Sequence, residues 1–179
     1  MYLEKDPNIS IKTINLILEA TDPADFLISR GRSKKEFTSS KKKIERGKFY
    51  SFRYNSKLFD EGLLPHFDLN PVILCIGVNS KYVLGLNFNY LPTQIRKRVI
   101  ERLKKIHKKW DKNTKVPNAT WKGLKTPLRN SKHMVKLYLK SRISGVIQIK
   151  NIDMEKLATK RTDNFVGKTA KTIWKNLGL

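Results

Sequence analysis

In the middle of the chain, residues 48–54 are rich in aromatic residues, residues 72–78 are β-branched and apolar, and residues 82–91 alternate between apolar and polar positions with the period of two that is typical of β-strands. Each of these three segments is predicted to be a strand. Residues 77–81 form a link short enough for a hairpin between the last two strands, whereas residues 55–71 form a longer loop. These segments predict a small antiparallel sheet.

The predicted third strand separates apolar and polar residues onto two faces. One face carries Leu84, Leu86, Phe88 and Tyr90, and the other carries Gly85, Asn87 and Asn89. A further strand is predicted at residues 145–150, where β-branched residues predominate. This strand would close the sheet into a small SH3-like barrel, so we expect an α+β fold.

Two helices are predicted between the third strand and the last one, because the apolar period changes there to three or four. The first spans residues 93–110, with Ile95, Val99, Leu103, Ile106 and Trp110 on one side. The second begins at Thr126 and Pro127, which are residue types typical of a helix start. It would turn Leu128, Met134 or Val135, Tyr138 and Leu139 toward the core, and Arg129, Lys132, Lys136 and Lys140 toward solvent.

The two ends of the chain predict short helices. Residues 9–18 fit an amphipathic helix, and residues 22–28 fit a further helical turn with Pro23 at its start. Near the other end, Asp153 is expected to cap a short helix through Leu157, and residues 167–176 to form a terminal helix.

These elements divide the chain into one main domain with an arm and a tail. Residues 1–46 are expected to form an N-terminal helical arm and basic linker. Residues 47–152 form the β-barrel domain, with the basic helices inserted at residues 93–142. Residues 153–179 form a C-terminal helical tail.

The net charge of the chain indicates more about its partner than any sequence motif does. The formal net charge is +23, from 38 Lys and Arg against 15 Asp and Glu. Solubility alone needs a net charge of only about 2 to 8. So large an excess repels itself, and a polyanion that relieves the repulsion is the simplest partner to infer.

The positive charge is concentrated in two segments. Residues 96–142 carry 17 basic side chains, opposed only by Glu101 and Asp111. Residues 30–48 carry nine basic side chains against two acidic ones, whereas residues 1–28 carry two basic and five acidic side chains. The first segment is the electrostatic centre of the molecule, and the second is typical of an exposed arm or loop.

The basic face of the first predicted helix has two interpretations. A charged face is commonly just solvated, but such a face usually interleaves Glu with Lys, and this helix has eight basic residues and one acidic residue. Phosphate contact is therefore the favoured interpretation. The candidate nucleic-acid-binding residues are Arg96, Lys97, Arg102, Lys104, Lys105, Lys108, Lys109, Lys41, Lys42, Lys43, Lys122, Lys125 and Trp121.

Aromatic residues near the basic segments are candidates for base stacking or for core packing. Trp110 and Tyr138 fall on the apolar sides of their predicted helices, which favours the core. Trp121 lies in a lysine-rich loop and is the better stacking candidate. No helix-turn-helix pattern, zinc-finger spacing or aromatic ribonucleoprotein motif is present, so DNA binding without sequence preference is expected.

The sequence offers little for metal binding or catalysis. His66, His107 and His133 are scattered, and Cys75 is a lone cysteine inside an apolar run, where we expect it to be buried and unable to form an internal disulfide. Three acids near His66, namely Asp60, Glu61 and Asp68, suggest a Mg²⁺-dependent nuclease as a weaker alternative. We expect no enzyme activity, no cofactor and no metal site.

Membrane association is not expected, because no segment has the roughly 18 apolar residues of a membrane span. The N-terminus lacks the pattern of a signal peptide, which favours synthesis in a reducing cytoplasm.

Three segments together resemble a group of small proteins from tailed bacteriophages: residues 47–54, residues 64–74, and residues 84–92 with the sequence Leu-Gly-Leu-Asn-Phe-Asn-Tyr-Leu-Pro. The resemblance covers about residues 47–103. Members of this group are virion-associated, and some are DNA end protectors. The resemblance implies a structural or DNA-handling role in a phage particle, with no catalytic residues. It suggests that the barrel is a rigid platform, with its Asn-rich strand available for protein contacts and Gly85 allowing a neighbouring backbone to approach closely there.

These observations favour a non-enzymatic, virion-associated phage protein that binds double-stranded DNA without sequence preference and protects or holds packaged genome ends. An alternative is a structural component of the head, neck or tail whose basic faces meet acidic surfaces of neighbouring subunits. A symmetric ring in the particle is compatible with either role, and other phage structural proteins are expected partners.

Overall fold

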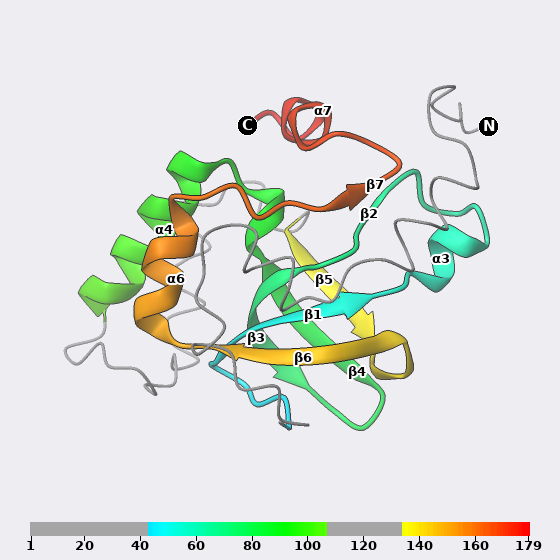
Figure 1. Cartoon of the computed structure of the whole chain (residues 1–179), viewed down its shortest axis with the longest axis horizontal. Coiled ribbons are helices and arrows are strands. Elements are labelled where there is room, and N and C mark those ends of the chain that lie inside the picture. The colour runs from blue at the N-terminus through cyan, green and yellow to red at the C-terminus, as the bar shows by residue number, and fades with distance from the viewer. Residues whose placement is uncertain (1–42, 107–133) are drawn as a thin grey trace.

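The computed structural model describes residues 43–106 and 134–179 (Figure 1). The strands are β1 (Phe49–Tyr54), β2 (Phe67–Asp68), β3 (Val72–Val78), β4 (Tyr82–Asn87), β5 (Val135–Leu139), β6 (Ile143–Ile149) and β7 (Phe165–Val166). The helices are α3 (Lys57–Asp60), α4 (Thr93–Ile106), α6 (Asn151–Ala158) and α7 (Ala170–Asn176), with the 3-10 helices η2 (Phe88–Tyr90) and η4 (Lys140–Arg142). No helix in these two ranges is long and apolar enough to cross a membrane.

The main sheet is antiparallel and strongly curled. Its strand order is β5-β4-β3-β1-β6, so the two edge strands are consecutive in the sequence and are joined only by η4. Neighbouring strands lie about 4.8 Å apart, so the edges of a flat five-stranded sheet would be separated by about 19 Å. The connection through η4 spans at most about 14 Å even when extended, so the sheet must bend to bring its edges together (Figure 1).

The sheet remains open, because no described ladder joins β5 to β6. The α+β class is confirmed, but the closed SH3-like barrel predicted from the sequence is not. A separate two-stranded sheet pairs β2 with β7.

The concave face of the sheet encloses one hydrophobic core. The Tyr138 ring on β5 lies 5.1 Å from the Phe52 ring and 4.9 Å from the Tyr54 ring, both on β1, although β4 and β3 separate these strands in the sheet. Tyr50, Ile73, Cys75 and Val83 belong to the same core. Because side chains alternate along each strand, the next residues face the other way.

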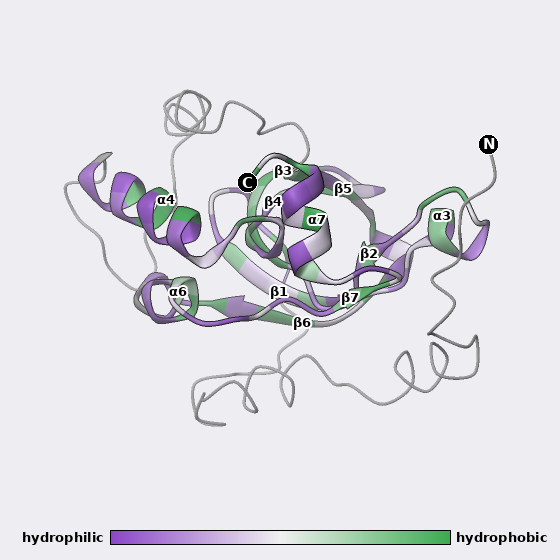
Figure 2. Cartoon of the chain, turned by 90° about the horizontal axis from the view of Figure 1, so that it is seen from above, coloured by the Kyte–Doolittle hydropathy of each residue, from purple (hydrophilic) through white to green (hydrophobic). Residues whose placement is uncertain are grey.

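The other face packs against three helices. Phe49, Leu74 and Leu86 from the sheet form one core with side chains of the helices: Val99, Ile100 and Leu103 on α4, Met154, Leu157 and Ala158 on α6, and Ile173 on α7. Helices α4 and α6 lie side by side, while α7 lies over η2 (Figure 2). Residues 153–179, predicted as a tail, therefore contribute directly to the folded core.

Two predicted elements need correction. The third strand ends at Asn87, because the Asn87 side chain accepts the backbone N–H of Asn89 at 2.8 Å and begins η2. The second predicted helix is wrong at its end: residues 135–139 form strand β5, paired with β4. Alternation of the apolar residues Val135, Leu137 and Leu139 also fits a period of two, and pairing with β4 decides between the two periods.

Most of the remaining predictions are confirmed. The structure has strands where they were predicted at residues 48–54, 72–78 and 145–150. It also has the predicted hairpin between β3 and β4, and the first basic helix through Ile106. Helix α6 begins after the N-cap Lys150, so Asp153 lies in its first turn and is not its cap. Predicted helices at residues 9–18 and 22–28, the end of the first basic helix at Trp110 and the start of the second at Thr126 lie outside the described residues.

Gly85 leaves room for its neighbour Ile73, because a side chain at residue 85 would collide with it. A Cβ at Gly85 would lie 2.7 Å from Cδ1 and 2.9 Å from Cβ of buried Ile73, so the close neighbour is a side chain and not the backbone that was predicted. We predict that Gly85→Ala lowers the free energy of unfolding by about 1–3 kcal/mol, measured by denaturant unfolding. Gly77→Ala is the control, because a Cβ there meets only Leu84 at 3.5 Å, and an equal loss in both variants would contradict this explanation.

Candidate nucleic-acid interface

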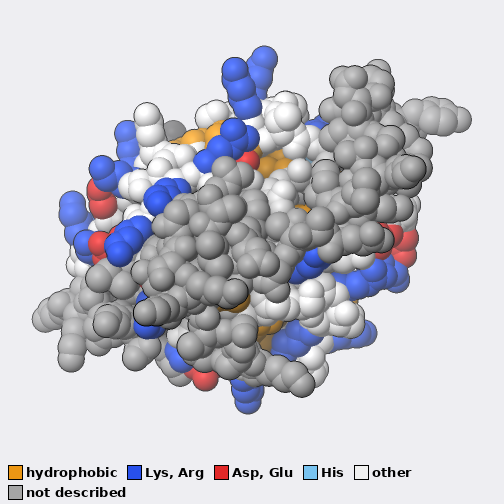
Figure 3. Space-filling view, viewed as in Figure 1, with side chains coloured by type: hydrophobic (Ala, Val, Ile, Leu, Met, Phe, Trp, Pro, Cys, Tyr) orange, Lys and Arg blue, Asp and Glu red, His pale blue; other side chains and the backbone are white. Residues whose placement is uncertain are grey.

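Helix α4 separates its apolar and basic residues onto two sides. Val99, Ile100 and Leu103 are buried, whereas the opposite side is exposed to solvent. The exposed basic residues are Lys97, Arg98, Arg102, Lys104 and Lys105. Figure 3 shows Lys and Arg side chains, with some Asp and Glu side chains among them, along the side of the molecule where α4 and α6 lie. Four of the candidate residues are thus placed together on one surface.

Carboxylates of the described chain do little to neutralise this surface. Lys104 pairs with Glu155 on α6 at 3.1 Å, and both side chains are partly exposed. Such a pair contributes only about 0.2–1 kcal/mol. Within residues 43–106 and 134–179, no carboxylate lies within ion-pair distance of Lys97, Arg98, Arg102 or Lys105. The positive charge of the helix therefore remains available to an external anion.

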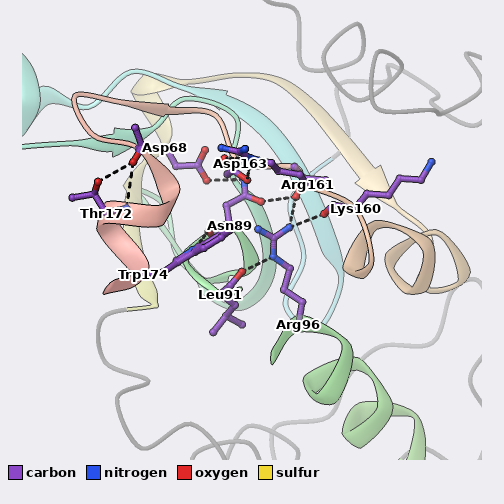
Figure 4. A network of polar contacts seen from close by, with 11 residues as sticks. Asp68, Asn89, Leu91, Arg96, Lys160, Arg161, Asp163, Thr172 and Trp174 are labelled. Atoms are coloured by element: carbon purple, nitrogen blue, oxygen red, sulfur yellow. Dashed lines mark hydrogen bonds and ion pairs between the residues drawn. The ribbon is translucent and has the colours of Figure 1, made fainter. Parts of the chain in front are cut away.

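Arg96 is the exception, and its predicted contact with phosphate does not fit its position. Its side chain is 0% exposed. Its Nε donates to the Leu91 carbonyl at 2.7 Å, and its Nη1 donates to the Lys160 carbonyl at 3.0 Å and to the Thr162 hydroxyl at 2.9 Å (Figure 4). Residue 96 lies three and four positions before Val99 and Ile100, so the helical period of the sequence already placed it on the apolar side.

Asn89 connects Arg96 to the rest of a buried polar network (Figure 4). Its Oδ1 accepts from the Thr162 hydroxyl at 2.6 Å, and its Nδ2 donates to Asp68 at 2.8 Å. Its backbone carbonyl accepts from the indole N–H of Trp174 on α7 at 3.1 Å. One asparagine therefore links β2, α7 and, through Thr162, the guanidinium of Arg96.

Asn87 extends the network on the sheet side. Its Nδ2 donates to Asp68 Oδ2 at 2.9 Å and lies 3.0 Å from the Tyr138 hydroxyl. Asn87 and Asn89 are both 0% exposed. The expectation that this Asn-rich strand is available for protein contacts is therefore wrong, because its amides satisfy buried polar groups of the same chain.

Asp68 is the buried carboxyl at the centre of this network. Burial raises its pKa from 3.8 to about 7, although hydrogen bonds from Asn87 and Asn89 oppose the shift. Burial also raises the pKa of Tyr138, and the nearby Asp68 adds to the rise. At neutral pH, Asp68 is therefore close to the midpoint of its titration.

The three acids considered for a nuclease site have separate partners. Asp60 pairs with Arg142 at 3.0 Å and Glu61 pairs with Lys57 at 3.4 Å, while Asp68 is buried in the network. Across the part of the chain that the structure describes, no group of three or more His, Cys, Asp or Glu residues is arranged to hold a metal ion. This arrangement gives no support to the nuclease alternative.

The remaining candidate residues differ in whether the structure describes them. Lys43 is described, and it is exposed. The following candidates lie outside the described residues: Lys41, Lys42, Lys108, Lys109, Trp121, Lys122 and Lys125. Cys75 is buried as expected, and burial raises the pKa of its thiol to about 11. Tyr138 is a core residue, as its apolar position indicated.

Lys136 was expected on the outer face of a helix, but the structure places it on β5. Its ammonium lies 4.1 Å from the centre of the Tyr90 ring, and burial lowers its pKa. No spacing in the sequence could reveal this contact, because the two residues meet only through the pairing of β5 with β4.

A comparison with known protein families shows which family this chain belongs to. The family described as Phage T4 terminal DNA protecting protein matches residues 30–177. The chain belongs to this family. The resemblance to phage DNA end protectors is thus confirmed, and the terminal DNA protecting family extends it from residues 47–103 into the basic segment and the C-terminal helices. No curated protein and no solved structure matches the chain.

Arg96 and Lys97 are adjacent basic residues on α4, but their replacement should affect the stability of the fold to different extents. Arg96→Lys keeps the charge but loses the planar fork that reaches three acceptors, so we predict a loss of about 1.5–3 kcal/mol in the free energy of unfolding. Lys97→Gln is the matched control and should change it by less than about 0.5 kcal/mol. Denaturant unfolding of both variants measures this difference, and equal stabilities would refute the structural role of Arg96.

Asp68 should make the fold less stable as pH rises. Its pKa is about 7 in the folded protein and near 3.8 when exposed, so the folded state binds the extra proton between these values. Deprotonation across this window therefore destabilises the fold. Asp68→Asn keeps an oxygen acceptor for Asn87 and Asn89 but does not titrate, so its free energy of unfolding relative to wild type should increase from about pH 5 to about pH 7.

The variant must be compared with wild type because the titration of His66 changes the stability of the fold with pH in the opposite direction. Burial and the nearby Lys136 and Lys168 lower the pKa of His66 from 6.5 to about 4, so this residue adds stability as pH rises through that range. Both proteins contain His66, and its contribution largely cancels in the difference. A difference that stays constant with pH would show that Asp68 titrates normally.

Proposed function

We propose that this chain is a non-enzymatic, virion-associated phage protein that protects or holds the ends of the packaged genome by binding duplex phosphates without sequence preference. We expect it to be made in the host cytoplasm. The exposed cations of α4, which no described carboxylate neutralises except at Lys104, are the observation that supports this function. The family's description as a terminal DNA protecting protein agrees with it.

The dimensions of α4 suit a duplex. Its 14 residues extend about 21 Å at 1.5 Å per residue. Double-stranded DNA carries one negative charge per about 1.7 Å of its axis, so about twelve phosphates lie along that length. Lys97, Arg98, Arg102 and Lys105 would displace condensed counterions from such a segment, which is the main source of sequence-independent affinity.

Protection of an end requires only that the end be covered. Phosphate contacts fix the position of a protein on DNA but carry no sequence information, so they suit a protein that must accept any terminal sequence. Steric exclusion of a nuclease needs no catalytic group on the protecting protein. The pairing of Asp60 and Glu61 with cations of this chain is consistent with that passive role.

Salt dependence tests the phosphate contacts. Affinity for linear duplex DNA should fall roughly a thousandfold or more between about 50 and 200 mM salt if 6 to 10 phosphates are contacted. The double variant Lys97→Gln and Arg102→Gln should reduce the slope of log Kd against log salt by about 1.8. The control replaces Lys57 and Lys81, two exposed lysines outside α4, and should leave the slope nearly unchanged.

Two results would count against this function. A nearly flat salt response would show that phosphates are not the main contact. If the chain also remained in particles emptied of DNA, a structural role against acidic neighbouring subunits would replace the proposal.

A further inference from the structure

A small pocket opens between β5 and the segment that runs from α3 to β2. Its volume is about 130 Å³. Tyr54, Tyr90 and Tyr138 contribute its aromatic lining, and His66, Asp68 and Lys136 its ionisable lining. A cavity of about 150 Å³ holds one benzene molecule, so this pocket has the size of a single ring.

Exposed leucines gather beside this pocket. Leu58, Leu64 and Leu137 line it at 47%, 36% and 57% exposure, and neighbouring Leu63 is 65% exposed. Within residues 43–106 and 134–179, only Val78 and Leu179 are other large hydrophobic side chains of comparable exposure. Three exposed leucines that line one opening form an apolar surface, and contiguous surfaces of this kind commonly mark binding sites.

Basic groups from three distant segments converge on the same place. Lys136 is held over the Tyr90 ring, and the His66 ring lies 6.0 Å from the same tyrosine. A Cβ at Gly167 would lie 3.2 Å from Cα of His66 and would collide with the Pro65 carbonyl, so the chain at Gly167 packs directly on this segment. This packing brings the next residue, Lys168, close to His66.

Polar atoms at the pocket also lack partners. Within the described residues, Nδ1 of His66 and Oδ1 of Asp68 are buried and make no hydrogen bond. Buried polar atoms without partners are uncommon and each calls for an explanation, such as a bound water, ion or ligand. Such atoms also occur away from the pocket in the described residues, as at Ser51 and Arg96. The pocket therefore combines a hydrophobic rim, cations and unused hydrogen-bonding groups.

A DNA end differs from the interior of a duplex in two physical ways. Its last base pair exposes a flat aromatic face that no other base pair covers, and its terminal phosphate is not part of a continuous backbone. The basic face of α4 can hold phosphates anywhere along a duplex. Recognition of an end needs an apolar surface beside cations, and the leucine-rimmed pocket supplies both.

We propose that the pocket and its leucine rim bind the terminal nucleotide of duplex DNA, with its 5′-phosphate near Lys136 and Lys168 and its ring against the exposed leucines. This inference rests on the DNA binding proposed above and adds a preference for ends. Every base has an apolar ring face, so the preference would not depend on the terminal base.

The test compares two forms of one duplex sequence: a blunt, 5′-phosphorylated form with open ends, and a form whose ends are closed covalently by hairpin loops. We expect the wild-type chain to bind the open form about tenfold more tightly, which corresponds to about 1.4 kcal/mol. Removing the 5′-phosphate should reduce this ratio. The ratio, and not the affinity itself, reports on the pocket.

Variants separate the pocket from α4. Lys136→Gln, and separately the double variant Leu58→Ser with Leu137→Ser, should lower the ratio toward one while leaving affinity for the closed form unchanged. The leucines are exposed, so their replacement should preserve folding, which circular dichroism checks. Val78→Ser is the matched apolar control on the β3–β4 hairpin, and Lys105→Gln should weaken both forms equally.

The possible failures are distinguishable. If wild type binds both forms equally and with strong salt dependence, the end preference is wrong although the phosphate binding proposed above stands. If the ratio survives both pocket variants, the leucine surface has another occupant, such as a protein, and the inference fails. If neither form binds, both proposals fail.

Discussion

The orientation of α4, and with it the positive surface of the molecule, depends on one buried guanidinium. Arg96 is fully enclosed, and burial lowers its pKa to about 10, so the side chain remains charged at neutral pH. A buried charge is tolerated only when it is well hydrogen-bonded. The carbonyl of Leu91, just before α4, and the carbonyl of Lys160, shortly after α6, supply two acceptors, whereas Nη2 has no hydrogen-bond partner among the described residues. The other lysines and arginines of α4 are exposed.

The same network explains why the C-terminal segment belongs to the fold. Thr162 accepts from Arg96 and donates to Asn89, while Trp174 donates to the Asn89 carbonyl. The Arg96 guanidinium also lies 6.0 Å from the centre of the Trp174 ring, within the range of a cation–π contact. Asn89 thus holds residues that are more than 70 positions apart in the chain. Neutral amides are suited to this role, because they donate and accept without adding a second buried charge.

Two surfaces with different chemistry follow from this core. The exposed side of α4 is rich in charge and poor in apolar groups, which suits contact with any stretch of a polyanion. The rim of the pocket beside β5 is apolar with cations next to it, which suits a structure that exposes a ring face and a phosphate together. A protein that must hold DNA and also find its ends benefits from having both. We propose that the first surface supplies general affinity and that the second supplies position along the DNA.

Composition was sufficient to predict β1 and β3, which are rich in aromatic and β-branched residues, and the helical period was sufficient to predict most of α4. Charge patterning also indicated a polyanion partner, which agrees with the family's description as a terminal DNA protecting protein. Sequence reasoning failed where residues act through distant partners. Arg96 was counted as a phosphate ligand, Asn87 and Asn89 as a free surface, and residues 135–139 as helix. A one-dimensional pattern shows which side of an element a residue occupies, but only the packing of segments tens of residues apart decides whether that side meets solvent, a neighbouring strand or a buried carbonyl.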